Sequence, residues 1–458
     1  MADMPVNTFT TGRLSSVYLK TALPIIFVMS MNGLLTVADA VFLGHYVGPE
    51  ALAAVTLIFP IYMLLVSLAT LVASGMSSIL ARHLGASDMS GAKDVFAGAH
   101  GLALALSAFL IALFLLFGAP LVLMMADGSA EIADMGYVYL MITILFAPLV
   151  FVLAVNSDAL RNEGRVGFMA AMSLCVSLTN IGFNYLLIAV FEMGVAGSAY
   201  GTSAAQMLTL IIIVSFRTWG VTELRPKVLL SHSLRSSWGR ILALGAPQSL
   251  NFMGLAIGSA LVIAALQWVQ TPTYDATISA YGIVTRVITF AFLPLLGLSH
   301  AMQTITGNNY GAQMWGRSNA SLRVTLVVAT VYCALVQVVV MVFSRQIAGG
   351  FVDDPLVIDE VARIFPIMTY LFFVMGPLMM IATHFQAIGS ATYAAVLGLT
   401  KPYLFAMPLT LLLPLWIGEI GIWYAGPIAE IMLLILTVVV LRLVARREQL
   451  RWGLFASV

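Results

Sequence analysis

Residues 17–44 of the chain read VYLKTALPIIFVMSMNGLLTVADAVFLG. Most of these positions are apolar, and the run exceeds the roughly 20 residues that a helix needs to cross a hydrocarbon core of about 30 Å. A backbone group left unpaired in lipid costs several kcal/mol, so a run of this kind crosses a bilayer as a helix. Residues 17–44 therefore predict a transmembrane helix.

The composition extends this prediction to the whole chain. Of the 458 residues, 61% are hydrophobic and 9% are charged, whereas a soluble domain carries about 25% charged residues. The apolar runs are too long for barrel strands and lack their alternation. The sequence predicts an all-α integral membrane protein with twelve transmembrane helices, at 17–44, 51–83, 92–118, 132–158, 165–190, 194–218, 237–268, 276–310, 317–345, 357–386, 391–416 and 421–446.

The basic residues predict the orientation of these helices. Cytoplasmic loops carry an excess of Lys and Arg. With the N-terminus inside, only Arg345 and Arg363 fall in outer loops. We therefore expect both termini in the cytoplasm, and the first span to be retained rather than cleaved. The net charge of +1 gives no indication of a nucleic-acid partner.

The chain repeats itself at an interval of about 225 residues. The segment GVAGSAY at Gly194–Tyr200 recurs as GEIGIWY at Gly418–Tyr424, and Pro24 matches Pro247. An even number of helices in each half gives two parallel repeats with the same topology. We expect two six-helix lobes joined by a polar linker, with bounds at 1–218, 219–236 and 237–458.

Asp39 is the most informative polar residue of the first span. It shares one helical face with Asn32 and Thr36, because the three are spaced by four and three residues. A carboxylate inside a span costs about 2.5–3.5 kcal/mol on insertion scales, so it normally faces a cavity or a partner. We expect Asp39 to be protonated or cation-bound in a functional site; the alternative is a structural carboxylate bonded to neighbouring helices.

Two more polar stripes lie in the fifth and sixth spans. Each follows one helical face, with spacings of three and four residues. Such side chains can join helices, for about 0.6 kcal/mol each, or they can converge on Asp39 and supply oxygens for a proton relay or a sodium ion, which prefers hard ligands. The stripes consist of Ser173, Ser177, Asn180 and Asn184, and of Ser198, Thr202 and Gln206.

The second half carries different charged groups inside its spans, namely Arg286, Lys401 and Glu430. We expect Arg286 and Glu430 to neutralise each other, while Lys401 either lines a cleft or has a structural role. Together they make a possible second-lobe site.

Pro24 near the start of the first span predicts a kink, because proline removes a helical hydrogen bond. A bend whose stability depends on the charge of Asp39 is a candidate gate.

Enzymatic chemistry finds no support in the sequence. Cys175 and Cys333 fall inside helices and lack the partners of a disulfide, metal or thiol-nucleophile site. No paired carboxylates, metal-ligand motif or serine–histidine signature lies within the spans. We expect no enzyme activity, no metal site and no cofactor beyond a proton or sodium gradient.

At these residues the chain resembles the multidrug and toxic compound extrusion (MATE) family. Five motifs carry the resemblance, which covers nearly the whole chain: VADAVFLG at 37–44, GPEALAA at 48–54, LRNEG at 160–164, GVAG at 194–197 and GIWYAGP at 421–427. The resemblance implies the MOP-superfamily fold and export of lipophilic, often cationic compounds in exchange for protons or sodium, by alternating access.

The DinF-like branch of the family is the most similar. There, coupling centres on an aspartate of the first helix, which Asp39 matches, and Asn180 and Thr202 match its polar partners. The branch commonly has a second aspartate where this chain has Asn184, and the acidic residues of the NorM-like branch are missing. The resemblance therefore places the coupling on Asp39 and favours protons, with sodium at the same site as the alternative.

Two other readings remain open. A lipid or lipid-linked oligosaccharide flippase of the same superfamily often has a strongly cationic cavity, for which only Arg286 and Lys401 are available here. A membrane scaffold or receptor would need neither the duplication nor Asp39. For the exporter we expect small lipophilic or cationic partners, a lipid bilayer, a monomer and a bacterial inner membrane.

Overall fold

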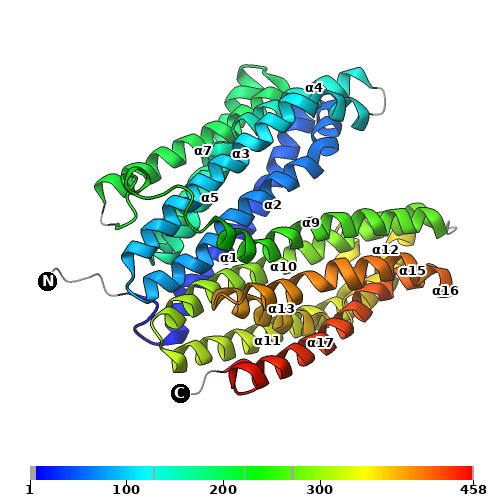
Figure 1. Cartoon of the computed structure of the whole chain (residues 1–458). Coiled ribbons are helices and arrows are strands. Elements are labelled where there is room, and N and C mark those ends of the chain that lie inside the picture. The colour runs from blue at the N-terminus through cyan, green and yellow to red at the C-terminus, as the bar shows by residue number, and fades with distance from the viewer. Residues whose placement is uncertain (1–6, 127–128, 221, 270–272, 456–458) are drawn as a thin grey trace. The chain divides into compact units, whose positions relative to one another are not determined.

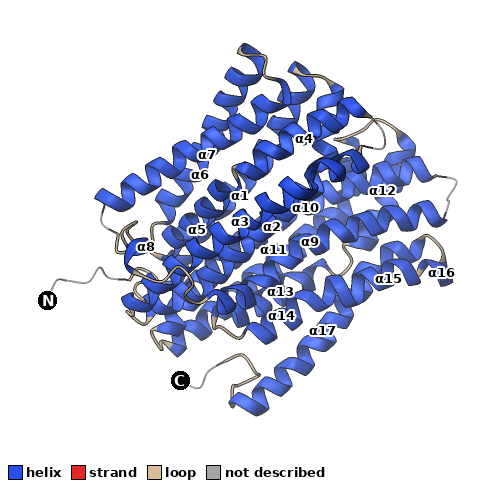
Figure 2. Cartoon of the chain, turned by 45° about the horizontal axis from the view of Figure 1, so that its top comes forward, coloured by secondary structure: helices blue, strands red, loops and turns tan. Residues whose placement is uncertain are grey.

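A computed structural model describes residues 7–126, 129–220, 222–269 and 273–455, and leaves the side chains of 32, 34–41 and 49 outside the description. Within these ranges the chain is helical and holds no strand beyond an isolated bridge between Arg451 and Phe455 (Figure 2). Among the described residues, ten helices are long and apolar enough to span a membrane, and counting each of two bent helix pairs as one span brings the number to twelve. The predicted all-α membrane fold is confirmed.

The described residues of the first half form nine helical segments. A residue with a polar side chain begins two of them: Asp88 accepts from Gly91 N–H at the start of α3, and Ser129 from Ile132 N–H at the start of α4. The hydrogen bond from Gly91, aided by His83, lowers the pKa of Asp88. The segments are α1 Leu14–Tyr46, α2 Pro49–Gly85, α3 Met89–Met125, α4 Ala130–Leu145, α5 Ala147–Asn162, α6 Val166–Asn184, the π-helix η1 Tyr185–Val190, α7 Gly194–Trp219 and the short α8 Val228–Ser231.

The second half repeats this order. Its segments are α9 Trp238–Val269, α10 Tyr274–Gly311, α11 Trp315–Gly349, α12 Pro355–Met368, α13 Phe372–Ala387, α14 Ala391–Leu399, the π-helix η2 Thr400–Ala406, α15 Met407–Leu412, α16 Pro414–Ile417 and α17 Ile420–Glu448.

The fourth span of each half is bent rather than continuous. The helix pairs α4–α5 and α12–α13 each turn by 47° at a short break. Pro148 lies in the first turn of α5, where its missing N–H is tolerated. Residues 132–158 and 357–386 were each predicted as one span and their bends were not predicted, because hydropathy alone does not register a break of one to three residues. The bend recurs in both halves, as a duplicated fold predicts.

Contacts divide the chain into two compact units. One unit holds Leu23–Ser249 with the residues before Phe9, and the other holds Phe9–Ala22 and Leu250–Val458. Both α1 and α9 therefore pass from one unit to the other along their length, near Pro24 and Pro247 respectively. The linear division at 218 and 237 stays a prediction about the duplicated halves.

In the first unit, helices approach closely at glycines. A methyl group at Gly75 of α2 would overlap the carbonyl oxygen of Ile241, and one at Gly245 of α9 would overlap that of Leu71. The two helices thus exchange backbone contacts at both glycines, which fixes the first turns of α9 against α2. Ser67 Oγ also donates to Ser249 O at 2.8 Å.

The polar segment after α7 packs on the same unit. Leu224 is fully buried, and the carbonyl groups of Leu234 and Ser236 lie against Gly101 and Gly98 of α3, where a side chain would not fit. Trp238 Nε1 donates to Gly98 O at 2.9 Å. The segment is therefore packed against the first unit at several points and is not a free linker.

The second unit has its own core, in which α11 packs on α13 and α10 on both α11 and α12 (Figure 1). Trp423, Phe365 and Leu266 are among its fully buried side chains. The start of the chain is bound here as well: Arg317 Nη1 donates to Gly12 O at 2.9 Å, and Tyr18 Oη lies 2.5 Å from Ser321 Oγ.

Candidate functional site

The polar stripes of α6 and α7 meet in the first unit. Asn184 Nδ2 donates to Asn180 Oδ1 at 3.3 Å, and Asn180 Nδ2 donates to Thr202 Oγ1 at 2.8 Å. Asn180 and Asn184 are buried, and Thr202 is half-buried. The two helix faces meet, as the spacing of their polar residues allows. Whether Asp39 joins them is not described, because its side chain lies outside the described residues.

Local backbone features allow this approach. The α-helical turns of α6 end at Asn184, where the wider turns of η1 begin. Short π-helical segments of this kind occur frequently at functional sites. On the facing helix, Gly201 leaves room for the amide of Asn184, since a methyl group there would overlap Asn184 Oδ1 and lie 3.2 Å from its backbone nitrogen. Because Gly201 has no side chain, the amide of Asn184 fits between α6 and α7.

Adding a methyl group at this point tests the importance of the arrangement. We expect Gly201→Ala to displace the Asn184 amide, and to lower transport about tenfold with little loss of stability because a terminal amide can move. Transport by proteoliposomes and thermal unfolding in detergent measure the two effects separately. Gly182→Ala on α6 is the matched control, since nothing lies within 4 Å of its added methyl group. Equal transport by both variants would show that the position of Asn184 does not matter.

The remaining site residues predicted in the first half are placed as follows. The backbone of Asn32, Thr36 and Asp39 lies in α1, but their side chains are outside the described residues. Ser177 is buried and donates to Ser173 O of its own helix at 3.2 Å, so its hydroxyl serves α6 itself. Gln206 on α7 is half-buried.

In the second half, the prediction that Arg286 pairs with Glu430 is wrong. Glu430 Oε2 is bound by Lys401 Nζ rather than by Arg286. Arg286 is exposed on α10 and has no hydrogen-bond or ion-pair partner among the residues that the structure describes. Lys401 reaches Glu430 from η2, whose wider turns set the direction of its side chain.

The sequence reasoning missed a group of buried charges near the ends of α5 and α7. Arg161 in α5 and Arg217 in α7 are almost fully buried, which was not predicted from the sequence. Arg161 Nη1 lies 2.8 Å from Asp158 Oδ1, and Arg217 Nη1 lies 2.8 Å from Glu163 Oε2. The spacing of three between Asp158 and Arg161 is the signal that could have revealed the first pair.

A histidine completes this group in an uncharged form. His100 Nδ1 lies 2.8 Å from the carbonyl oxygen of Phe96, and Nε2 lies 3.0 Å from Asn156 Nδ2. A carbonyl oxygen only accepts, so Nδ1 carries the hydrogen and Nε2 accepts from the amide. The geometry assigns a neutral, structural role to His100.

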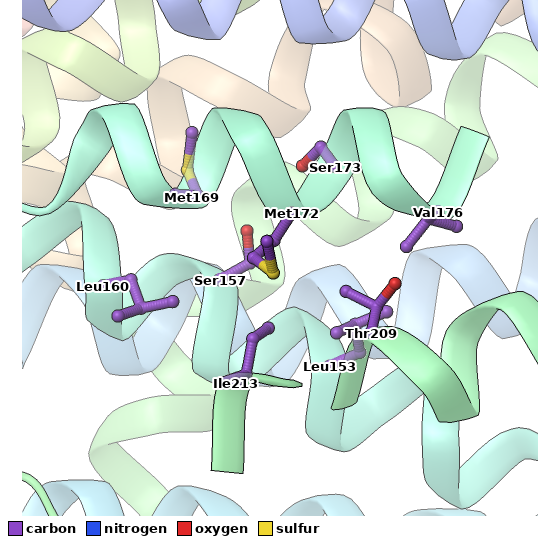
Figure 3. Close-up of a pocket in the computed structure, with 9 residues that line it drawn as sticks. All are labelled: Leu153, Ser157, Leu160, Met169, Met172, Ser173, Val176, Thr209 and Ile213. Carbon is purple, nitrogen blue, oxygen red and sulfur yellow. The ribbon is translucent and has the colours of Figure 1, made fainter. Parts of the chain in front are cut away.

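A cavity of about 30 Å³ lies between α5, α6 and α7 (Figure 3). Its wall is mostly apolar, with Met169 and Met172 from α6, and Thr209 from α7 places a fully buried hydroxyl in it. The volume is that of a single small molecule such as water. Pockets for drug-sized compounds have volumes of roughly 300–1,000 Å³. This cavity is far smaller, so it is not a substrate site.

The cluster of Asn180, Asn184 and Thr202 offers only neutral amide and hydroxyl groups. Within the described ranges no group of three His, Cys, Asp or Glu side chains is placed to hold a metal ion. Two amides and one hydroxyl can bond an acid or ligate a hard cation. The arrangement suits binding and coupling rather than covalent catalysis.

Known proteins of similar sequence are membrane transporters. The chain is 24% identical over 429 residues to the FAD transporter of Shewanella oneidensis, covering 91% of this chain and 92% of that protein. It is 22% identical over 417 residues to the probable multidrug resistance protein YoeA of Bacillus subtilis, covering 89% of each.

Solved structures give the same fold. A MATE protein in its bent conformation superposes with a TM-score of 0.86 at 21% identity, covering 96% of this chain and 98% of that one. The MatE family model matches the chain twice, at residues 24–186 and 250–412. These two matches have the same length and cover most of both predicted halves, so they confirm the duplication as well as the resemblance. The chain belongs to the MatE family of multidrug efflux transporters, which are integral membrane proteins and not enzymes.

Proposed function

We propose that the chain is a secondary active antiporter that exports lipophilic, often cationic compounds in exchange for protons, with Asp39 as the coupling carboxylate. The observation that carries this proposal is the direction of the hydrogen bonds in the first unit. Asn184 donates to Asn180 and Asn180 donates to Thr202. Among the described side chains, the series runs one way and ends on the hydroxyl of Thr202.

A hydroxyl that accepts a hydrogen bond still has its own hydrogen to donate. The three side chains are neutral, so the cluster can stabilise a neighbouring anion through Thr202 without neutralising it. A carboxylate at such a site alternates between a bonded anion and a protonated acid, which is what proton exchange requires. Asp39 shares a helix face with Asn32 and Thr36 and is the acid that we place there.

The test is efflux of a fluorescent lipophilic cation from proteoliposomes, with a pH gradient and a sodium gradient imposed separately. We expect the pH gradient to drive efflux in wild type, and Asp39→Asn to lower the rate at least about tenfold, because an amide cannot exchange a proton. Asp275→Asn, which changes an exposed acid at the start of α10, is the control and should keep the full rate. Unchanged proton-driven efflux by Asp39→Asn would reject Asp39 as the coupling group.

The other outcomes of this assay separate the alternatives. Efflux driven by sodium alone would make Asp39, Asn180, Asn184 and Thr202 ligands of a sodium ion. No flux under either gradient would favour the lipid flippase, and lipid-linked substrates would then replace the dye.

The FAD transporter among the relatives adds a second substrate class, a flavin nucleotide. The half-exposed cation Lys401 favours testing it, because a nucleotide carries negative charge. The bacterial relatives support a bacterial inner membrane, and the basic loops support cytoplasmic termini. A monomer suffices for this proposal, since one duplicated chain contains both lobes.

A further inference from the structure

We propose that Lys401 and Glu430 form a site for an anionic group of a substrate, in which the anion replaces Glu430 at Lys401 while Glu430 takes up a proton. The proposal goes beyond the coupling role of Asp39, since it concerns other residues in the other unit. It also differs from cation export, because it assigns a carboxylate or phosphate group to the ligand.

The two partners of this pair differ in exposure. The side chain of Glu430 is 5% exposed, whereas that of Lys401 is 26% exposed. A ligand entering the unit therefore reaches the ammonium before it reaches the carboxylate. The accessible half of the pair is positive, which favours an anionic over a cationic ligand.

Hydrogen-bond capacity leads to the same conclusion. An ammonium has three N–H donors, and that of Lys401 uses one, on Glu430 Oε2, within the part of the chain that the structure describes. The second oxygen of the carboxylate, Glu430 Oε1, is buried and has no hydrogen-bond partner there. The pair thus leaves donors open on its exposed side and an unsatisfied acceptor on its buried side, where a proton fits and a bulky cation does not.

The π-helix η2, which carries Lys401, allows the Lys401 side chain to change direction. Lys401 lies in η2, with Pro402 after it, and Tyr403 Oη of the same segment donates to Leu250 O at 2.7 Å. A π-helical turn has weaker internal bonding than an α-helical one and is a frequent feature of functional sites. The side chain of Lys401 can therefore turn from Glu430 to a ligand while Tyr403 keeps η2 attached.

Replacement of Glu430 by an anion at Lys401 also affects the charge of the Glu430 carboxylate. When Lys401 turns to an anion, Glu430 is left buried without a counter-ion. A buried, unpaired carboxylate is costly and takes a proton instead. Binding of an anion is thus accompanied by proton uptake.

No other ionised side chain on the packed elements is bonded to Glu430 in the described ranges. Elements α12 to α16 and η2 pack against α17. Glu360 and Arg363 of α12 bind each other and Glu419 near the start of α17. The other titratable residues on these elements are Asp359 on α12, His384 on α13, Tyr393 on α14 and Tyr403 on η2, while α15 and α16 have none. From α11, the neutral thiol of Cys333 lies close enough to interact with the charge of Glu430.

The test compares flavin mononucleotide with riboflavin, which differ by one phosphate, by fluorescence titration of the purified full-length protein in detergent. We expect wild type to bind the mononucleotide about tenfold more tightly, as one charge-assisted bond provides. Lys401→Met should bind both flavins equally. Glu430→Gln should keep or strengthen the preference, because Lys401 is then free of its carboxylate.

Proton uptake gives the second readout. At about pH 8, above the second ionisation of a phosphate, we expect wild type in weak buffer to take up protons when the mononucleotide binds, and Glu430→Gln to take up none. The double variant Lys401→Met/Glu430→Gln leaves no buried charge and checks folding. Arg286→Met, which removes an exposed cation of the same unit, should keep both the preference and the uptake.

Three results would overturn the proposal: no preference of wild type for the phosphate, an equal loss of preference in Arg286→Met, or undiminished proton uptake in Glu430→Gln. The assay uses no gradient, and we expect Asp39→Asn to behave as wild type in it. Failure here therefore leaves the antiport proposal standing, and failure of antiport leaves this site testable.

Discussion

Gly245→Ala is expected to lower the free energy of unfolding by about 3 kcal/mol, the upper end of the usual cost of overpacking. The added methyl group would overlap the carbonyl oxygen of Leu71 and lie 2.8 Å from its carbon. A backbone carbonyl cannot rotate away as a side chain does, so α9 and α2 must move apart. That separation also strains the opposite contact, at Gly75, and the bond between Ser67 and Ser249.

Thermal unfolding in detergent, followed by size-exclusion chromatography, measures this effect. Gly239→Ala lies on the same helix six residues earlier, where the position is exposed and nothing lies within 4 Å of the new methyl group. Alanine is the better helix former by about 1 kcal/mol, so this control should be neutral or slightly stabilising. Equal stability of the two variants would mean that α2 and α9 do not touch at these glycines.

Arg217→Met is expected to cost about 3–5 kcal/mol, the range for breaking a buried ion pair. The guanidinium is 1% exposed; it donates to Glu163 Oε2 at 2.8 Å and to Leu224 O at 2.9 Å, and it lies 5.0 Å from the ring centroid of Phe96. Methionine retains much of the volume but leaves the Glu163 carboxylate without its counter-ion. Arg345→Met, which breaks an exposed pair with Asp359, should change the stability too little to measure.

The cost of Arg217→Met should depend on pH. Burial raises the pKa of Glu163 above its ordinary value even with Arg217 beside it. The variant is therefore most stable at low pH, where Glu163 is protonated in both states, and loses stability as the pH rises through the raised pKa of the folded state. Adding Glu163→Gln should recover a large part of the loss at neutral pH. A pH-independent loss would show that packing, rather than the unpaired carboxylate, is responsible.

The spans and the meeting of α6 with α7 followed from the sequence because each rests on one local rule. Length and hydropathy define a span, and the spacing of Asn180 and Asn184 defines a face. Two such faces on consecutive antiparallel helices can meet whatever the rest of the fold does. The repeat then supplied the topology, since one half constrains the other.

The partner of Glu430 was not predictable in this way. Arg286 and Lys401 were both available, and the choice depends on how their helices are rotated. The wider turns of η2 rotate Lys401 away from the direction that a 3.6-residue period gives. The burial of Arg161 and Arg217 was not predicted for a related reason: they lie near helix ends, where one turn decides between an exposed charge and a buried pair.

The path of α1 has a consequence for synthesis of the chain. Residues 9–22 belong to the second unit, and the partner of Tyr18, Ser321, is made 303 residues later. Residues up to Ser249 complete the first unit before that partner exists. Residues 9–22 therefore lack their contacts with the rest of the second unit until the residues around Ser321 have been made, and the second unit is completed only after the first.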